Sequence, residues 1–112
     1  VERTDTVFTA GYTRDQVVRF PVAHHDGNYF TDPETLKRIE DQNQVAFRYC
    51  TASGEVARAA NPNGSLNNIA GIFNAERNVL GLMPHPDRAF DRALGSEDAT
   101  AMFRSLAEKI AA

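Results

Sequence analysis

The sequence lacks the features that mark secreted, membrane-spanning and disulfide-stabilised proteins. Its 112 residues contain one cysteine, which excludes an internal disulfide framework and fits a reducing compartment. No apolar run approaches the roughly 18 residues of a membrane span, and no stretch has the charged, apolar and small-residue succession of a signal peptide. We therefore expect no contact with a membrane and a cytoplasmic location.

Signatures of nucleotide and nucleic-acid binding are missing as well. The chain has no Rossmann glycine fingerprint, no Walker lysine and no pair of cysteines, so we expect no cofactor in it. The net charge is -3, with lysine and arginine spread along the chain. Without a basic cluster, a nucleic-acid partner is not expected.

The residues that are present fit one small globular domain. A chain of 112 residues with 42% hydrophobic residues is long enough for one modest core and too short for two domains. Apolar and β-branched residues predict strands at residues 16–23 (QVVRFPVA) and 44–49 (QVAFRY), the second with Val45, Phe47 and Tyr49 on one face. Residues 1–12 are mixed and polar, which indicates a loop or an edge.

Two helices are predicted from their caps and apolar faces. Asp32 followed by Pro33 marks the start of a helix that ends at about residue 41 and buries Leu36 and Ile39. Ser96 is the expected cap of a last helix, which runs to about residue 111. The buried face of that helix is predicted to consist of Ala99, Met102, Phe103, Leu106 and Ile110.

Residues 61–83 combine turn chemistry with a hairpin. NPNGS at residues 61–65 is typical of a turn, and residues 68–74 (NIAGIFN) and 78–83 (NVLGLM) predict two antiparallel strands joined by a tight turn. The second strand is apolar from Val79 to Met83, which favours burial on both faces. Together with the predicted helices, this order indicates an α/β layered domain.

His85, Pro86 and Asp87 follow the second of these strands. Pro86 favours an extended conformation at His85, and residues two apart in an extended segment project to the same side. A carboxylate beside an imidazole fixes the tautomer and leaves the second nitrogen free to act as base and then acid. His85 and Asp87 are therefore the candidate catalytic pair, with a purely structural turn as the alternative.

The segments around this pair resemble a known enzyme family. NPNGSLNNIAGI and NVLGLMPHPDRA are similar to the last part of the glutaminase subunit of phosphoribosylformylglycinamidine synthase, a class I glutamine amidotransferase. When the family motif Met-Pro-His-Pro-Glu-Arg is aligned with this sequence, the family's catalytic histidine corresponds to His85. Its glutamate corresponds to Asp87, whose side chain is shorter. The resemblance extends over nearly all 112 residues but corresponds to the C-terminal half of the usual subunit. It implies a truncated single domain, with helices packed on a mixed sheet.

A second loop, VAHHDGNYF, resembles the family segment Ile-Ala-His-Gly-Glu-Gly-Arg-Tyr. This resemblance makes His24, His25, Asp26 and Gly27 candidate neighbours of the substrate. His25 and Asp26 replace a glycine and a glutamate of the family, so the local backbone is expected to differ. A polar loop without a catalytic role, and a metal site using His24, His25 and His85, remain open as alternatives.

Cys50 does not match the family's nucleophile. The family places its cysteine in a Gly-x-Cys-x-Gly turn between a strand and a helix, where backbone amides stabilise the oxyanion. The sequence around Cys50 is RYCTA, without either glycine. We interpret Cys50 as an ordinary residue at a strand end, and the resemblance then implies that the nucleophile comes from the half of the subunit that this chain lacks.

The resemblance also implies a reaction and partners. The reaction is hydrolysis of L-glutamine to glutamate and ammonia for de novo purine (IMP) biosynthesis. The implied partners are a synthetase subunit, which uses ATP and magnesium, and a small accessory subunit. By itself the chain is expected to be inactive. The alternative is a non-catalytic fragment or degenerate homologue that keeps only the fold and a partner-docking surface.

Overall fold

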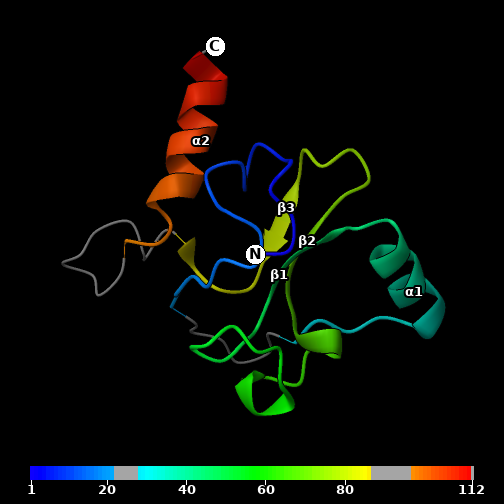
Figure 1. The fold of residues 1–112 in the computed structure, drawn as a ribbon. Coiled ribbons are helices and arrows are strands. Elements are labelled where there is room, and N and C mark those ends of the chain that lie inside the picture. The colour runs from blue at the N-terminus through cyan, green and yellow to red at the C-terminus, as the bar shows by residue number, and fades with distance from the viewer. Residues whose placement is uncertain (22–27, 87–96, 112) are drawn as a thin grey trace.

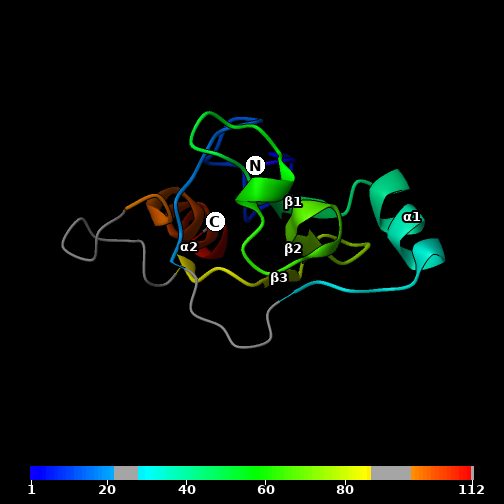
Figure 2. The same ribbon diagram turned by 90° about the horizontal axis from the view of Figure 1, so that it is seen from below.

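The computed structural model of the chain describes residues 1–21, 28–86 and 97–111. Its elements, in chain order, are α1 (Pro33–Asp41), β1 (Val45–Arg48), the 3-10 helices η1 (Arg58–Ala60) and η2 (Leu66–Asn68), β2 (Ile69–Phe73), β3 (Leu80–Leu82) and α2 (Thr100–Ala111). Figure 1 shows the strands near the centre with α1 and α2 on opposite sides, and Figure 2 shows the same separation from below. The predicted α/β class is confirmed.

The sheet has the order β1-β2-β3, and both pairings are antiparallel. β2 and β3 form the predicted hairpin, with Gly71 opposite Leu82 and Phe73 opposite Leu80. The prediction that the second strand is buried on both faces is wrong, because β3 is an edge strand among the described residues and Gly81 is exposed. The strand with a partner on each side is β2, and four of its five residues are buried.

Burial does not alternate along β1 as predicted. Val45, Ala46 and Phe47 are all buried, and the pairing with β2 is irregular on both sides of Phe47. Val45 belongs to a small cluster with Ile39 and Ile69. Phe47 lies in the main cluster, whose buried members are Tyr12, Ala46, Phe47, Ala70, Phe73 and Met102. The prediction of one shared face is wrong because a bulge interrupts the period of two on which it depends.

The prediction of a strand at residues 16–23 is wrong for the described part of that segment, which has no regular secondary structure. Its backbone makes isolated contacts, such as the bond from Arg19 N to Asp98 Oδ2 at 2.7 Å. Val18 and Phe20 still pack against the core, although Val17 is 42% exposed. The Phe20 ring meets the Phe47 ring edge-on at 5.7 Å between centroids. The strand-like composition therefore reflects partial packing of two side chains against the core, and not a hydrogen-bonded ladder.

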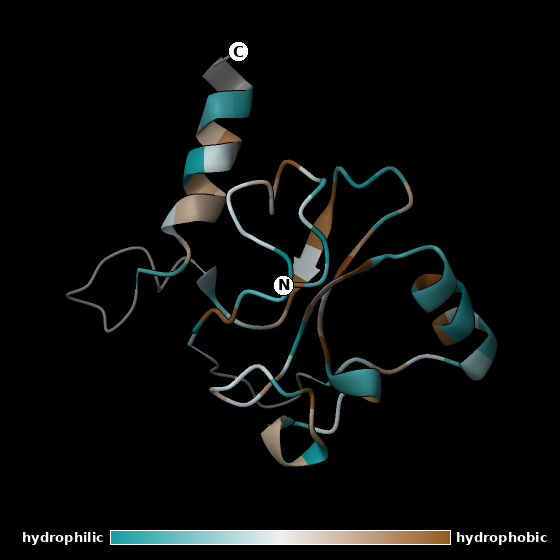
Figure 3. Cartoon of the chain, viewed as in Figure 1, coloured by the Kyte–Doolittle hydropathy of each residue, from teal (hydrophilic) through white to brown (hydrophobic). Residues whose placement is uncertain are grey.

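Helix α1 matches the predicted helix and its cap. The Asp32 side chain accepts a hydrogen bond from Thr35 N, and Pro33 occupies the first turn. Ile39 is buried as predicted, whereas Leu36 is only partly buried against the same cluster. Figure 3 shows hydrophilic residues over most of α1 and hydrophobic residues along the strands. Helix α1 therefore contacts the strands through a narrow apolar face, where Ile39 packs with Val45 and Ile69.

Helix α2 begins at Thr100, later than the predicted cap at Ser96, which lies outside the described residues. The buried face is confirmed for Ala99 and Met102, and Leu106 is partly buried. Phe103 is 39% exposed, so its assignment to the buried face is wrong. Ile110 lies at a position whose side chain is not described.

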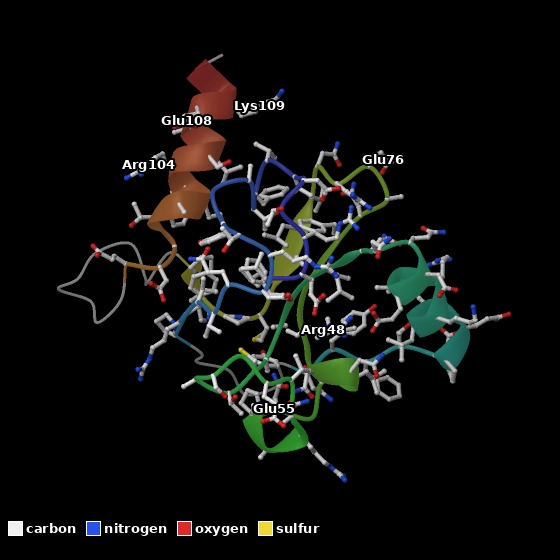
Figure 4. All side chains as sticks on the ribbon, in the orientation of Figure 1. Arg48, Glu55, Glu76, Arg104, Glu108 and Lys109 are labelled. Atoms are coloured by element: carbon white, nitrogen blue, oxygen red, sulfur yellow. The ribbon has the colours of Figure 1, made fainter. Side chains whose placement is uncertain are left out.

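The loop predicted for residues 1–12 is confirmed. Its residues contact α2 and the segment just before that helix. Ser105 Oγ donates to Val7 O at 2.7 Å, and the Tyr12 hydroxyl donates to Asp98 O at 2.6 Å. A Cβ atom at Gly11 would lie 2.9 Å from Ala101 O, so only glycine permits this approach. The charged residues Arg104, Glu108 and Lys109 point outward from the helix (Figure 4).

Arg48 (labelled in Figure 4) joins four segments of the chain. Its Nε donates to Glu2 Oε1 at 2.8 Å, its two Nη atoms donate to both oxygens of Glu40, and Nη1 also donates to Asn67 O at 2.9 Å. The Arg48 side chain is 17% exposed. Asn67 Nδ2 donates in turn to Glu40 Oε2 at 2.9 Å. The planar guanidinium thus ties the N-terminal segment, α1, β1 and η2 together.

Replacing Arg48 with lysine is expected to lower the free energy of unfolding by about 1–3 kcal/mol, because a lysine cannot make the two-pronged contact with Glu40 and leaves Asn67 O short of a donor. Urea unfolding followed by circular dichroism measures the loss. The control is Lys37→Gln, which removes the exposed Lys37–Asp41 pair and should leave the unfolding midpoint unchanged. Equal midpoints for Arg48→Lys and the native chain would contradict the assigned role.

Stability should also fall at acidic pH through Glu40. The hydrogen bonds from the Arg48 guanidinium hold the pKa of Glu40 below its ordinary value. The contribution of Glu40 to the free energy of unfolding is therefore complete above the unfolded pKa of about 4.3, and it is lost as pH falls through the lower folded pKa. Urea midpoints measured from neutral to acidic pH should show this decline, and Glu40→Gln should flatten it. A decline of the same size in Glu40→Gln would assign it to other carboxylates.

Candidate active site

His85 lies just beyond the β2–β3 hairpin, at a fixed strand exit. Met83 N donates to Ala70 O at 3.0 Å, which extends the pairing one residue past β3. Pro84 is buried and His85 is partly buried. The His85 N–H donates to Pro21 O at 2.8 Å. Because Pro84 and Pro86 restrict the backbone on either side, this one bond fixes the direction in which the chain leaves the sheet.

The remaining predicted site residues lie outside the described part of the chain. These are Asp87 of the catalytic pair and His24, His25, Asp26 and Gly27 of the proposed substrate loop. The shared direction of His85 and Asp87 therefore stays a prediction. The structure does show how the chain is held just before residues 22–27. The carbonyl of Pro21 accepts a hydrogen bond from the His85 N–H.

Tyr29, which follows this segment in the sequence, is held by two hydrogen bonds. Tyr29 N donates to Ser65 Oγ at 2.9 Å, and Leu66 N donates to Tyr29 O at 3.0 Å. Ser65 is only 4% exposed, and its hydroxyl donates onward to Asn63 Oδ1 at 2.7 Å. Pro21 is thus held by one contact to the His85 backbone, and Tyr29 by one contact each to Ser65 and Leu66.

The turn predicted at residues 61–65 is confirmed, and the side chain of Asn61 organises it. Asn61 Oδ1 accepts from the backbone N–H groups of Asn63, Gly64 and Ser65, at 3.2, 2.8 and 3.2 Å. Asn61 Nδ2 donates to Ser65 O at 2.8 Å. Gly64 has φ of +76°, which a residue with a side chain rarely adopts. These polar groups are used within the scaffold, so the turn supports the site through Ser65 and Tyr29.

Cys50 is a free, partly buried thiol two residues beyond β1. The chain after it forms a turn, closed by Thr51 N to Glu55 O at 2.8 Å, and the next helical element is η1 at residues 58–60. Cys50 therefore lies at no helix N-terminus, where amide dipoles would stabilise a thiolate. The position of Cys50 agrees with its interpretation as a strand-end residue, and the absence of a catalytic role stays a prediction.

Two cavities border the hairpin, and neither was predicted from sequence. One of about 370 Å³ has Pro84, the neighbour of His85, in its wall; it is lined by residues 17–20, 47–52, Ala70, Leu82 and Pro84. The other, of about 340 Å³, is lined by Asn28, Tyr29, residues 69–72 and residues 81–83. A cavity depends on packing between distant segments, which local sequence patterns do not report.

Sequence reasoning also missed the Arg48 cluster. The available signal was a single cation at the end of the apolar run VAF, since a charge in such a setting needs partners. The partners Glu2, Glu40 and Asn67 come from three other segments, and no local pattern names them.

Two other expectations from the sequence concern a metal site and a membrane-spanning helix. Among the described residues, no group of three or more His, Cys, Asp and Glu side chains is placed to hold a metal ion. The metal alternative using His24, His25 and His85 stays untested, because the first two lie outside this part. In the described ranges, no helix has the length and apolar character to cross a membrane.

Comparisons with known proteins agree with this architecture. Residues 1–107 match the family described as CobB/CobQ-like glutamine amidotransferase domain. The phosphoribosylformylglycinamidine synthase subunit PurQ of Chlorobium chlorochromatii (strain CaD3) is 58% identical over 101 residues, which are 90% of this chain and 43% of that relative. PurQ of Rhizobium meliloti (strain 1021) is 53% identical over 112 residues, or 100% of this chain and 47% of the relative.

A solved structure, PurLQS from Thermotoga maritima, has the same fold. The match has a TM-score of 0.76 and 34% sequence identity, and it covers 98% of this chain and 44% of that chain. The chain thus spans a little under half the length of the relatives it matches. These findings confirm the resemblance noted around residues 61–90: the chain belongs to the CobB/CobQ-like glutamine amidotransferase family.

Proposed function

We propose that this chain supplies the histidine-bearing part of a glutaminase that makes ammonia for phosphoribosylformylglycinamidine synthase in purine biosynthesis. The observation that carries the proposal is His85, fixed between two prolines at the exit of a hairpin, in a chain whose residues 1–107 match an amidotransferase family. The relatives named as a synthase subunit support the same assignment.

In the proposed reaction a cysteine thiolate attacks the side-chain amide carbon of L-glutamine. His85 takes the thiol proton and gives it to the departing nitrogen, so that ammonia leaves and a glutamyl thioester remains. His85 then removes a proton from water, which attacks the thioester and releases glutamate and the thiol. Asp87 orients the imidazole and stabilises its charged form. His24, His25, Asp26 and Gly27 are the proposed neighbours of the bound glutamine.

The nucleophile is proposed to come from the part of the relatives that this chain does not match. Cys50 is the single cysteine of the chain, and it follows a strand and precedes a turn. Cys50 does not lie at a helix N-terminus, where backbone amides would favour its thiolate. The chain alone is therefore proposed to be inactive.

The proposed partners are a synthetase subunit and a small accessory subunit. The relatives are named as a subunit, and the structural neighbour is named PurLQS, which supports a multi-subunit assembly. ATP and magnesium are assigned to the synthetase subunit, since this sequence has no nucleotide-binding fingerprint. The assembly is proposed to act in the cytoplasm.

A second candidate function is a non-catalytic homologue that keeps only the fold and a docking surface. The observation in its favour is Asp87, which stands where the resemblance places a glutamate. Aspartate has about 1.5 Å less reach, and a misplacement of about 1 Å can lower a catalytic rate by about a hundredfold.

The two functions are separated by a chimera in which this chain replaces the matching 101-residue segment of the Chlorobium PurQ. Reconstituted with that organism's other synthase subunits, the chimera should release ammonia from glutamine. His85→Asn should lower kcat by about a hundredfold or more, because it removes the general acid and base. The control is Arg104→Gln on the exposed face of α2. A chimera that folds but releases no ammonia would favour the non-catalytic function.

The same chimera tests the shorter carboxylate. If the reach of Asp87 limits orientation of His85, Asp87→Glu should raise kcat severalfold with little change in KM, because the missing methylene is restored. Steady-state ammonia release over a range of glutamine concentrations separates the two constants. An unchanged or lower kcat means that the backbone already compensates for the shorter side chain.

A further inference from the structure

The turn at residues 61–65 contains the one Asn-Gly pair of the sequence, Asn63-Gly64. An asparagine before glycine can lose its side-chain amide without an enzyme, because the backbone nitrogen of the next residue attacks the amide carbon. Glycine favours this attack, since it has no side chain to obstruct the approach and its backbone has the widest range of conformations. The sequence therefore places a chemically reactive pair in this turn.

The surroundings of this pair leave it open to water. Gly64 is exposed and Asn63 is partly buried. Apart from its neighbours in the chain, no heavy atom lies within 4 Å of where a Cβ atom of Gly64 would be. Water, which the second step of the reaction consumes, therefore reaches the pair. Burial does not protect it, so any protection has to come from hydrogen bonds.

The attacking nitrogen is held by the side chain of Asn61. Gly64 N donates to Asn61 Oδ1 at 2.8 Å. The Asn61 carboxamide is itself fixed at its other end, because Nδ2 donates to Ser65 O at 2.8 Å and to Asn68 Oδ1 at 3.1 Å. The Gly64 N–H cannot lose its proton or turn toward a new partner until this bond opens.

The amide under attack is held as well. Asn63 Nδ2 donates to the Tyr49 hydroxyl at 3.2 Å, and Asn63 Oδ1 accepts from Ser65 Oγ at 2.7 Å and from Ser65 N at 3.1 Å. The bonds from Ser65 also polarise the carbonyl, which by itself would favour attack. Polarisation has no effect while the nucleophile is bound elsewhere, so the bond between Gly64 and Asn61 decides the rate.

We propose that Asn63 is a site of spontaneous deamidation, and that the Asn61 side chain suppresses the reaction while the turn is closed. When the turn opens, Gly64 N forms a bond to Asn63 Cγ. The bond from Cγ to Nδ2 breaks, the proton of the Gly64 N–H passes to Nδ2, and ammonia leaves a cyclic succinimide. Water then adds to either ring carbonyl and opens the ring to aspartate or isoaspartate. The proposal goes beyond the proposed function and does not rest on it.

The products differ from asparagine in ways that alter the turn. Both lack the NH2 group that donates to the Tyr49 hydroxyl. Isoaspartate also continues the backbone through the former side-chain carbon, which moves Gly64 N away from Asn61 Oδ1. Once formed, isoaspartate therefore keeps the turn from closing in its original form.

The test compares the purified chain with a synthetic peptide of residues 59–77, which has the same Asn-Gly pair without the fold. Both are incubated at one mildly alkaline pH. Aspartate and isoaspartate at position 63 are then quantified by tandem mass spectrometry, for the chain in its tryptic peptide of residues 59–77. We expect the chain to react at least about tenfold more slowly, because its hydrogen bonds must open first. Equal rates, or no reaction in the peptide, would overturn the proposal.

Asn61→Ala tests the assigned protection. It removes the acceptor of the Gly64 N–H, so deamidation of Asn63 in the chain should become at least about tenfold faster. Hydrogen exchange of the Gly64 amide should accelerate with it, because both processes require the same bond to open. A rate at Asn63 equal to that of the native chain would refute the protective role of Asn61.

Tyr49→Phe provides a second route if Asn61→Ala does not fold. It removes only the hydroxyl that accepts from Asn63 Nδ2, so the rate should rise severalfold. The matched control is Tyr12→Phe, which removes a hydroxyl that donates to Asp98 O instead and should leave the rate unchanged. Equal rates in the two variants would assign the reaction to general unfolding and overturn the local protection. The readout is a chemical change at one residue, so it is independent of glutaminase activity.

Discussion

The guanidinium of Arg48 is the contact on which the arrangement of this chain depends. It is a largely buried cation at the end of β1, and it reaches Glu2, Glu40 and Asn67 from three other segments. A buried charge that loses its partners is costly, because neither water nor protein then solvates it. The N-terminal segment, α1 and η2 therefore have to meet at one point, and this requirement fixes where α1 lies relative to the sheet.

The candidate site is built by backbone contacts more than by side chains. The hairpin delivers His85 between two prolines, and the His85 N–H binds Pro21 O. On the other side, Ser65 and Leu66 bind both backbone groups of Tyr29. The two anchors bound the loop that the sequence singled out as a neighbour of the substrate. Their effect is to bring the strand exit, the loop ends and the Asn61 turn into one part of the molecule.

Features encoded by neighbouring residues were predictable. The Asp32 cap, the hairpin of β2 and β3, and the turn at residues 61–65 each depend on contacts between residues close in sequence. The errors have a common origin in distant contacts. Residues 16–21 have strand-like composition, but only Val18 and Phe20 pack against the core and the segment forms no ladder. Irregular pairing in β1 separates Val45 from Phe47. Amino-acid composition indicates which side chains tend to be buried, but it does not indicate which backbone segments pair with one another.

The sequence by itself determined the family, the hairpin and the identity of His85 as the candidate base, because motifs and turn chemistry are local and specific. Only the tertiary structure decided that β3 is an edge strand of the described sheet, that Arg48 binds Glu2 and Asn67, and that Pro21 O accepts from the His85 N–H. The physical reason is the same in each case. These features arise from pairs of residues far apart along the chain, and which pairs meet depends on the packing of the whole core.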